Sequence, residues 1–413
     1  MHGADDSVRA VVASLTRMRR GHLAVQGPPG TGKTYLAAHV IKELIDQHQW
    51  AIGVTAQSHK VIENVLEAVV RDAGLPPDLA GKKPESGGAG AGDGSADSYV
   101  QISPSCFLDF AARRAATGYL IGGTAWDMAN PTRVAPRQLD LLVIDEAGQF
   151  SLANTIATAV SAKRILLLGD PQQLPQVSQG IHPAPVDGSA LGHIIGGEAV
   201  LAPQFGYFLD ESRRMSQAIA EQVSRLAYEG KLHAHASTIG RALAGVAPGL
   251  HAVPVVHSGN STCSEEEGAV VVDLVRQHLG LAWTGCSGAA PAPLREADLI
   301  VVTPYNSQVE LIRRRLDEAG HCDVPVGTVD KFQGREAVVS IVSLAASDAT
   351  EVPRGIEFLL NRNRLNVSIS RAKWAAYLVH SPALTDYLPH TPEGVATLSR
   401  FITLVGEASE ELV

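Results

Sequence analysis

The chain has 413 residues, of which 45% are hydrophobic, and it carries a formal net charge of −9 and four cysteines. This length allows two domains with separate cores, and the negative charge excludes a protein that attracts polyanions through its overall field. No apolar run reaches the roughly 20 residues of a membrane span, and the first residues lack the apolar region of a signal peptide. We therefore expect a cytoplasmic protein without membrane contact. The cysteines have no CxxC spacing, which argues against a zinc or iron–sulfur site.

The first predicted elements surround a glycine-rich loop. Residues 22–25 indicate a short buried strand, and residues 35–49 a helix with an apolar stripe. The sequence between them follows GxxxxGK[ST], a pattern whose backbone N–H groups and helix N-terminus bind phosphates. We predict that Lys33 reaches the β- and γ-phosphates and that the Thr34 hydroxyl binds Mg²⁺. The predicted nucleotide-binding residues of the loop are Gly27, Pro28, Pro29, Gly30, Thr31, Gly32, Lys33 and Thr34.

A pair of carboxylates follows a later strand. After strands at 51–55 and 119–122, which are separated by a Gly-rich loop expected at 76–98, an apolar strand at 141–144 ends in Asp145 and Glu146. One carboxylate at a strand end can hold Mg²⁺, while its neighbour orients and deprotonates the attacking water. We assign Asp145 to the metal and Glu146 to the general base. In isolation, an acidic turn after a strand would be the alternative.

A polar turn follows the next strand, at 164–168. An amide in this turn could donate to the γ-phosphate and accept from the attacking water, and we choose Gln173 for that role. A second series of predicted strands lies at 206–209, 299–303, 326–329, 338–344 and 375–380. Strands that alternate with helices predict parallel sheets with helices on both faces. Two series predict two α/β domains, at 1–198 and 199–413.

These motifs resemble those of superfamily 1 helicases. GPPGTGKT, DEAGQ and GDPQQLPQ look like motifs I, II and III, and the remaining segments follow in the family's order. They are residues 54–60 (motif Ia), 122–125 (the short threonine motif), 211–215 (motif IV), 326–336 (motif V) and 364–373 (motif VI). The DEAxQ form is similar to the nonsense-mediated-decay-helicase-like branch, which moves 5′-to-3′. The resemblance extends from residue 22 to residue 380.

The resemblance implies two tandem RecA-like P-loop domains with ATP and Mg²⁺ bound in the cleft between them. It places Arg214 and Arg371 against the γ-phosphate, where a guanidinium suits the charge of phosphoryl transfer. It also implies that Glu336 accepts from the ribose hydroxyls. Residues expected to contact the backbone of a nucleic-acid strand are Thr55, Ser58, Thr124, Thr303, Pro304, Tyr305 and Thr328.

Two departures from the family pattern concern the base and the inserts. Residues 7–20 contain no glutamine for reading adenine, and Arg213 stands where an aromatic residue often stacks on the base, so base selectivity for ATP stays open. Relatives carry a β-barrel insert ahead of the phosphate loop, whereas 26 residues precede Gly27 here. We expect either a minimal motor or the motor portion of a longer polypeptide.

The predicted function is an ATP-dependent translocase or helicase that acts as a monomer and moves 5′-to-3′ on single-stranded DNA. RNA is the alternative substrate. One alternative is a nucleic-acid-stimulated ATPase switch that remodels without unwinding. Another is the motor of a helicase–nuclease polypeptide, with the nuclease as a domain or partner. A phosphate-loop kinase or GTPase is disfavoured by the second-domain motifs, and an inactive remnant by the intact set of site residues.

Overall fold

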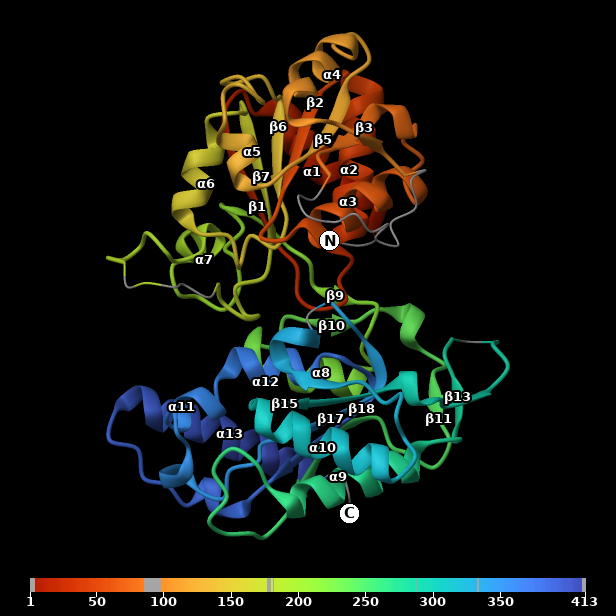
Figure 1. Cartoon of the computed structure of the whole chain (residues 1–413), viewed down its shortest axis with the longest axis vertical. Coiled ribbons are helices and arrows are strands. Elements are labelled where there is room, and N and C mark those ends of the chain that lie inside the picture. Colours follow the sequence, from red (N-terminus) through yellow and green to blue (C-terminus); the bar gives the residue numbers. More distant parts are fainter. Residues whose placement is uncertain are drawn as a thin grey trace. The chain divides into compact units, whose positions relative to one another are not determined.

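The structure, a computed structural model, describes residues 4–84, 98–176, 180, 182–286, 288–332 and 334–410 (Figure 1). By their contacts the residues form two compact units. Unit 1 comprises residues 1–28, 32–171 and 175–210, and unit 2 comprises 29–31, 172–174 and 211–413. The main division thus follows Asp210, whereas the sequence analysis placed it after residue 198.

Unit 1 contains a sheet of eight parallel strands in the order β4-β3-β5-β2-β6-β7-β1-β8. Because crossover connections are needed between parallel strands, helices cover the sheet. The strands are β1 (Gly21–Gln26), β2 (Ala51–Thr55), β3 (Ala80–Lys82), β4 (Val100–Gln101), β5 (Tyr119–Gly122), β6 (Leu141–Ile144), β7 (Arg164–Gly169) and β8 (Gly206–Phe208).

Two cores lie on the two faces of this sheet, because successive side chains of a strand point to opposite sides. Val143 of β6 belongs to the core under α1, α2 and α3, and its neighbours Leu142 and Ile144 belong to the core that includes residues of α4, α5 and α7. The helices of unit 1 are α1 (Ala4–Arg17), α2 (Lys33–His48), α3 (His59–Arg71), α4 (Phe107–Arg113), α5 (Ala125–Ala129), α6 (Leu152–Ala159) and α7 (Ala190–Ile195).

Unit 2 contains a parallel five-stranded sheet in the order β12-β18-β17-β15-β16. Its strands are β12 (Gly249–Pro254), β15 (Leu299–Thr303), β16 (Val326–Thr328), β17 (Ala337–Ser343) and β18 (Ala372–His380). Its helices are α8 (Gln217–Ala227), α9 (Glu265–His278), α10 (Asn306–Glu318), α11 (Ile356–Leu359), α12 (Arg362–Ile369) and α13 (Pro392–Glu410). Short strands form two small sheets, β9 (Glu211–Ser212) with β10 (His233–Ala234), and β11 (Ala242–Leu243) with β13 (Ala282–Thr284) and β14 (Ala292–Pro293).

The two parallel sheets confirm the predicted fold class, two α/β domains of RecA-like type. Three details of the prediction are wrong. The strand predicted at 206–209 was assigned to the second series. It corresponds to β8, which instead pairs with β1 at the edge of the first sheet. Residues 77–82 were expected in a flexible loop, but they form a 3₁₀ turn and β3, which pairs with β5. β12, an edge strand of the second sheet, was not predicted.

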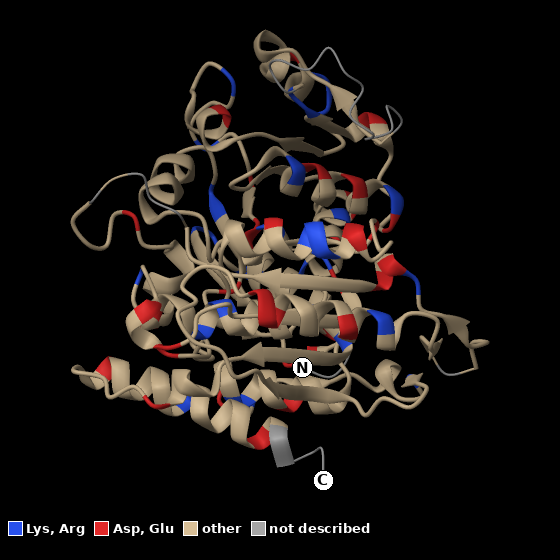
Figure 2. Cartoon of the chain, turned by 60° about the horizontal axis from the view of Figure 1, so that its bottom comes forward, with Lys and Arg blue, Asp and Glu red and all other residues tan. Residues whose placement is uncertain are grey.

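The rest of the predicted Gly-rich loop, residues 85–97, lies outside the described residues, as does Gln333 of the segment that resembles motif V. Within the described ranges no helix is long and apolar enough to cross a membrane. Basic and acidic residues lie interspersed along the helices in the view of Figure 2, in keeping with a surface that uses both signs of charge.

Candidate functional site

The loop between β1 and α2 is shaped by two glycines. Gly30 and Gly32 have φ values of 76° and 83°, in the left-handed region that glycine adopts without a steric penalty. Gly32 is the N-cap of α2, and no side chain caps this helix end. The Gly27 N–H donates to the Gly169 carbonyl at 2.9 Å, and Lys33 Nζ donates to the Gly27 carbonyl at 2.6 Å. The loop thus places a helix N-terminus and an ammonium group together, a combination that favours an anion.

The carboxylate pair lies directly after β6. Asp145 is 5% exposed, and its Oδ1 accepts from the Glu146 N–H at 2.9 Å. Glu146 has a φ of 51°, a left-handed conformation that is strained for a residue with a side chain. Burial and the neighbouring Glu146 charge raise the pKa of Asp145 to about 7, against the opposing effects of the Glu146 N–H and the Lys33 charge. A cation beside this pair would therefore be stabilising.

The donor set of unit 1 suits magnesium. Thr34 supplies a hydroxyl and Asp145 a carboxylate, and Mg²⁺ prefers such oxygen ligands. Within the described part of the chain, no three His, Cys, Asp or Glu side chains gather to hold a metal by themselves. Magnesium commonly binds through one or two protein oxygens, substrate phosphates and water. The residues present therefore fit a magnesium ion that arrives with a nucleotide.

The turns after β6 and β7 are packed backbone to backbone. The Ala147 N–H donates to the Leu168 carbonyl at 2.7 Å. A Cβ at Gly148 would lie 2.5 Å from the Asp170 carbonyl oxygen, and one at Gly169 would lie 2.6 Å from the Ala147 nitrogen. Only glycine fits this approach, so these two glycines hold the carboxylate turn in a rigid position.

The turn that contains Gln173 groups with unit 2. Gln173 is buried, and its carbonyl accepts from Asn363 Nδ2 at 2.6 Å. The carbonyl of Gln172 accepts from Asn366 Nδ2 at 2.8 Å. Side chains of α12 therefore hold the main chain of the residue that we predicted as the γ-phosphate sensor.

Two predicted site residues of unit 2 are joined in one ion cluster. Glu336 accepts from Arg214 Nε at 2.9 Å and from Lys373 Nζ at 2.8 Å. Arg214 also donates to the Ser370 carbonyl at 3.2 Å. Burial opposes ionisation of Glu336, but the hydrogen bond from Lys373 and the charge of Arg214 hold its pKa below the usual value. The carboxylate that was predicted for the ribose thus fixes Arg214.

Arg371 is held differently. Its side chain is 2% exposed, and Nε donates to the Val367 carbonyl at 3.0 Å. Nη1 donates to the carbonyls of Arg335 at 3.2 Å and Phe332 at 3.4 Å. Arg371 therefore joins the end of α12 to the segment before β17.

Sequence reasoning missed Arg241. Its guanidinium donates to the Arg214 carbonyl, to the Arg213 carbonyl at 3.0 Å and to the Gly285 carbonyl at 3.1 Å. Burial lowers the pKa of Arg241, against the nearby Glu336 charge. The residue lies in none of the motifs, so no local pattern could have shown that it supports the main chain of Arg214.

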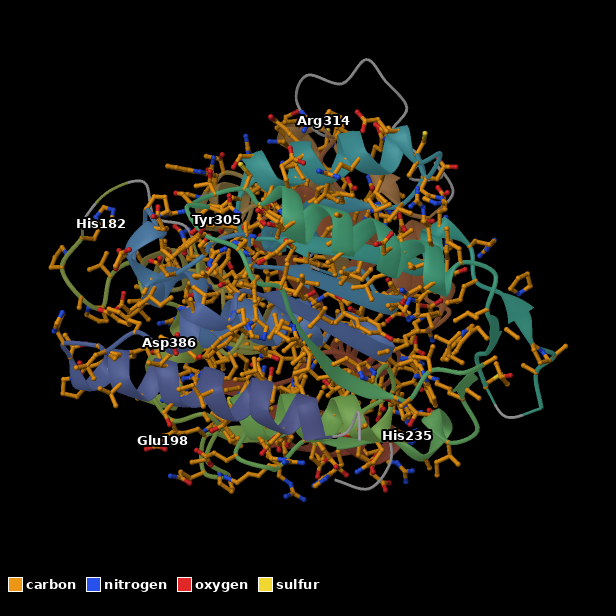
Figure 3. All side chains as sticks on the ribbon, turned by 90° about the horizontal axis from the view of Figure 1, so that it is seen from below. His182, Glu198, His235, Tyr305, Arg314 and Asp386 are labelled. Atoms are coloured by element: carbon orange, nitrogen blue, oxygen red, sulfur yellow. The ribbon has the colours of Figure 1, made fainter. Side chains whose placement is uncertain are left out.

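Two of the residues predicted to contact a strand occupy equivalent places in the two sheets. Thr55 ends β2 and Thr303 ends β15, and both side chains are buried. Among the residues that the structure describes, no hydrogen-bond partner reaches the hydroxyls of Thr55, Thr303 or Tyr305. Tyr305 directly precedes α10 (Figure 3), and burial raises the pKa of its hydroxyl. Leaving buried hydroxyls unpaired is unfavourable, which is typical of functional positions.

The other predicted contacts have local roles. Ser58 caps α3 by accepting from the Val61 N–H at 3.3 Å, and Thr124 forms a capping box with Asp127 at the start of α5. Thr328 ends β16 beside Thr303. Pro304 lines a small cavity with Thr303.

The basic cluster on α10 and His235 have structural partners. Arg314 extends outward from α10 (Figure 3), and it and Arg315 pair with Glu265 of α9. Arg313 donates to carbonyls after α10. His235 hydrogen-bonds to Ser237 at 2.9 Å.

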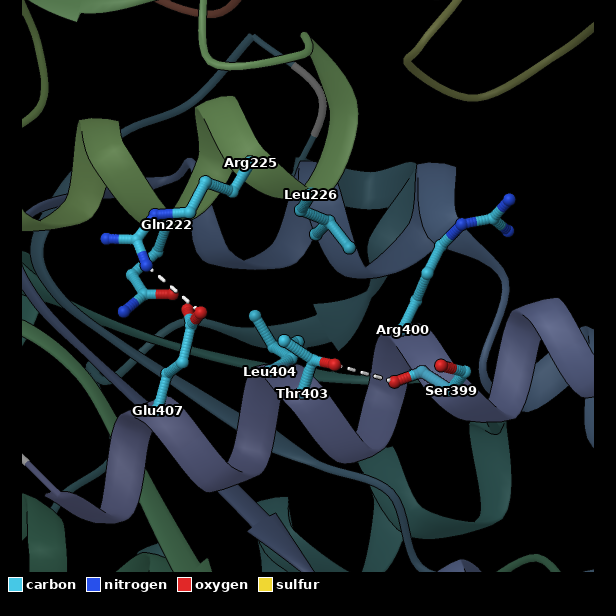
Figure 4. A pocket seen from close by; sticks show the side chains of 8 residues that line it. All are labelled: Gln222, Arg225, Leu226, Ser399, Arg400, Thr403, Leu404 and Glu407. Carbon is cyan, nitrogen blue, oxygen red and sulfur yellow. Dashed lines mark hydrogen bonds and ion pairs between the residues drawn. The ribbon is translucent and has the colours of Figure 1, made fainter.

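A separate pocket of about 180 Å³ lies between α8 and α13 of unit 2 (Figure 4). Arg225 pairs with Glu407 across it at 3.0 Å, and Arg400 lines its other end. None of the predicted site residues lines this pocket.

Two family models, each described as an AAA domain, match residues 4–190 and 198–382. The chain is 24% identical over 388 residues to the DNA replication ATP-dependent helicase/nuclease DNA2 of Gallus gallus, covering 90% of this chain and 36% of that protein. It is 24% identical over 404 residues to the regulator of nonsense transcripts 1 homolog of Neurospora crassa, covering 87% and 35%. Among solved structures, the Arterivirus nonstructural protein 10 helicase matches with a TM-score of 0.47 at 14% identity, covering 91% of this chain and 61% of that one.

The chain spans about a quarter to a third of the length of the curated relatives that it matches.

Proposed function

We propose that this chain, a superfamily 1 helicase motor core that is similar to the nonsense-mediated-decay-helicase branch, uses ATP hydrolysis to move 5′-to-3′ along single-stranded DNA. The observation that carries the proposal is the pair of the buried Asp145 and the half-buried Glu146, which shares unit 1 with Lys33 and Thr34 of the phosphate loop. Phosphoryl transfer needs a bound phosphate, a bound cation and an oriented water, and these residues can bind or orient all three.

The residues of unit 1 would have distinct tasks. The loop N–H groups and Lys33 bind the phosphates, and Thr34 and Asp145 would hold Mg²⁺, which supplies charge neutralisation at the phosphates when bound. Glu146 takes the proton of the attacking water. The strained backbone at Glu146 supports this role, because strain is concentrated at functional positions.

Unit 2 would supply the positive charge. We assign Arg214 and Arg371 to the transition state, with Gln173 as the γ-phosphate sensor. Hydrolysis would then depend on residues of both units, so that each ATP cycle is coupled to a domain movement.

The strand would be bound through its backbone. The unpaired hydroxyls of Thr55 and Thr303 are suitable donors to phosphates, as are the hydroxyls of Ser58, Thr124 and Thr328. Pro304 has no donor and would contribute only an apolar contact. Such contacts ignore base identity, as a motor on any sequence requires. DNA is favoured over RNA because one relative is named a DNA replication helicase/nuclease.

The test is ATP hydrolysis with and without an oligo-dT strand. We expect stimulation by the strand in the wild type and loss of hydrolysis in Lys33→Ala and Glu146→Gln. Lys42→Ala is the matched control, because Lys42 lies on the same helix and pairs with Asp46 at the surface. Hydrolysis that ignores single strands would refute the proposal.

A second candidate is an ATPase switch that binds a strand without unwinding duplexes; a separate alternative is the motor portion of a longer helicase–nuclease polypeptide. It is favoured by the short share of each relative that the chain covers. Duplexes with a 5′ or a 3′ single-stranded tail separate the two candidates. Unwinding of the 5′-tailed duplex supports the helicase, and strand-stimulated hydrolysis without unwinding supports the switch.

A further inference from the structure

Among the described residues of unit 1, the most exposed large hydrophobic side chain is a tryptophan on α5. Trp126 is 85% exposed, whereas Trp50, Trp283 and Trp374 are half-buried. Trp283 and Trp374 pack against each other at 5.9 Å, and Arg164 lies over Trp50 at 4.4 Å. Among the described residues no ring or cation covers Trp126, so a large apolar surface faces water. An exposed indole can stack on a planar ligand.

The exposure of Trp126 is not the result of a loose segment. Asp127, the next residue, is 1% exposed and accepts from the Thr124 N–H at 2.9 Å and from its hydroxyl at 2.8 Å. Met128 on the same turn is buried in the core. The backbone that carries the indole is therefore fixed, and a rigid aromatic ring loses little entropy when a ligand stacks on it.

Trp126 follows the strand end where nucleic-acid contacts are proposed. The Gly123 N–H donates to the Val54 carbonyl at 3.0 Å, so the start of α5 is bonded to the end of β2. Thr55 is the last residue of β2, and Thr124 is the N-cap of α5. The indole thus lies two residues beyond Thr124, one of the proposed phosphate contacts, on the helix that starts beside the end of β2.

The charges around α5 suit a polyanion. Lys83 and Arg133 both pair with the single carboxylate of Asp127, at 3.7 Å for Lys83. One positive charge of this cluster is therefore left over. Positive groups beside an exposed aromatic ring form the usual combination for single-stranded nucleic acid.

We propose that Trp126 is a stacking platform for one base of the bound single strand. This inference rests on the proposed function and deepens it, because it adds a contact to a base where the motif residues would contact only the backbone. Stacking on an indole is tolerant of sequence, since every base has an aromatic face. The platform would therefore hold the strand without selecting a sequence.

The test compares two strands and three proteins. Binding of oligo-dT and of an abasic strand of equal length is measured by fluorescence anisotropy for the wild type, Trp126→Ala and Trp126→Phe. We expect Trp126→Ala to bind oligo-dT about 5- to 140-fold more weakly, and Trp126→Phe to retain most of the affinity. The abasic strand should bind equally to wild type and Trp126→Ala. Hydrolysis of ATP without a strand should not change in any variant.

Ile156→Ala is the matched control, because Ile156 is also an exposed apolar residue of unit 1, at 63%. Equal binding of oligo-dT by wild type and Trp126→Ala would overturn the stacking proposal. Strand-stimulated hydrolysis would survive that result if the proposed function is correct. Its absence in the wild type would instead refute the proposed function itself.

Discussion

The two units hold their charged groups in opposite ways. In unit 1, Asp145 and Glu146 are adjacent carboxylates, and burial and their mutual repulsion raise the pKa of Asp145 to about 7. In unit 2, Glu336 pairs with the two cations Arg214 and Lys373, which hold its pKa below the usual value. Unit 1 thus keeps unbalanced charge for a ligand to complete, whereas unit 2 keeps an arginine oriented beforehand.

This difference predicts how each unit responds to a bound nucleotide. A cation and phosphates would relieve the repulsion in unit 1, so ligand binding is expected to stabilise that unit. An oriented arginine in unit 2 would need no rearrangement when charge develops on a phosphate. The following variants test the contrast between the two units.

Arg214→Ala should have the largest effect on catalysis. Loss of an arginine that stabilises the phosphoryl-transfer transition state lowers kcat by about 10³-fold or more. The ion pair with the partly exposed Glu336 contributes about 1 kcal/mol or less to folding. Steady-state hydrolysis and urea unfolding would check both expectations, with Arg225→Ala of α8 as the control. Unchanged kcat would remove unit 2 from the chemistry.

Asp145→Asn should stabilise unit 1 in the absence of magnesium. A folded pKa of about 7 exceeds the unfolded value of about 3.9, so the ionised group destabilises the folded state at neutral pH. The gain is at most about 4 kcal/mol, from 1.36 kcal/mol for each pKa unit.

The direction in which the Asp145 charge changes stability can be checked by varying the pH. In EDTA, wild-type stability should rise as the pH falls through 7, because the folded state takes up the proton first, and the variant should lose this slope. Thermal unfolding between pH 6 and 8 measures it. A wild-type stability that is flat over this range would mean that the carboxylate pair carries no unbalanced charge.

Arg371→Ala should destabilise unit 2. Its buried guanidinium donates to the carbonyls of Val367, Arg335 and Phe332, and the variant loses these hydrogen bonds together with the packing of the side chain. The expected loss is roughly 2–4 kcal/mol in the free energy of unfolding. Urea unfolding beside Arg214→Ala shows whether Arg371 contributes more to folding than Arg214 does, in addition to its proposed role in hydrolysis. Equal stability of the two variants would contradict the structural role of Arg371.

Arg241→Lys should give the smallest effect. A lysine keeps the charge but cannot hold the carbonyls of Arg213, Arg214 and Gly285 together. Loss of about 1 kcal/mol of hydrogen bonding would lower kcat about 5-fold through a less well oriented Arg214, with KM for ATP unchanged. A change in KM alone would show that Arg241 acts on binding instead.

The sequence predicted best what depends on neighbours along the chain. The phosphate loop, the carboxylates after β6 and the strand runs are local patterns, because a strand, its end and the following helix are covalently adjacent. β8 was assigned to the wrong sheet and β12 was missed, because both are edge strands whose pairing is set by partners far away in the sequence.

The sequence by itself determined the fold class and the chemical types at the strand ends. Only the tertiary structure decided that Glu336 fixes Arg214, that Arg371 is buried among carbonyls and that Arg241 supports the chain beside it. It also decided that Trp126 stands exposed on a rigid turn. The reason is physical, since burial and hydrogen bonding between residues far apart in the chain exist only once the sheets and helices have packed.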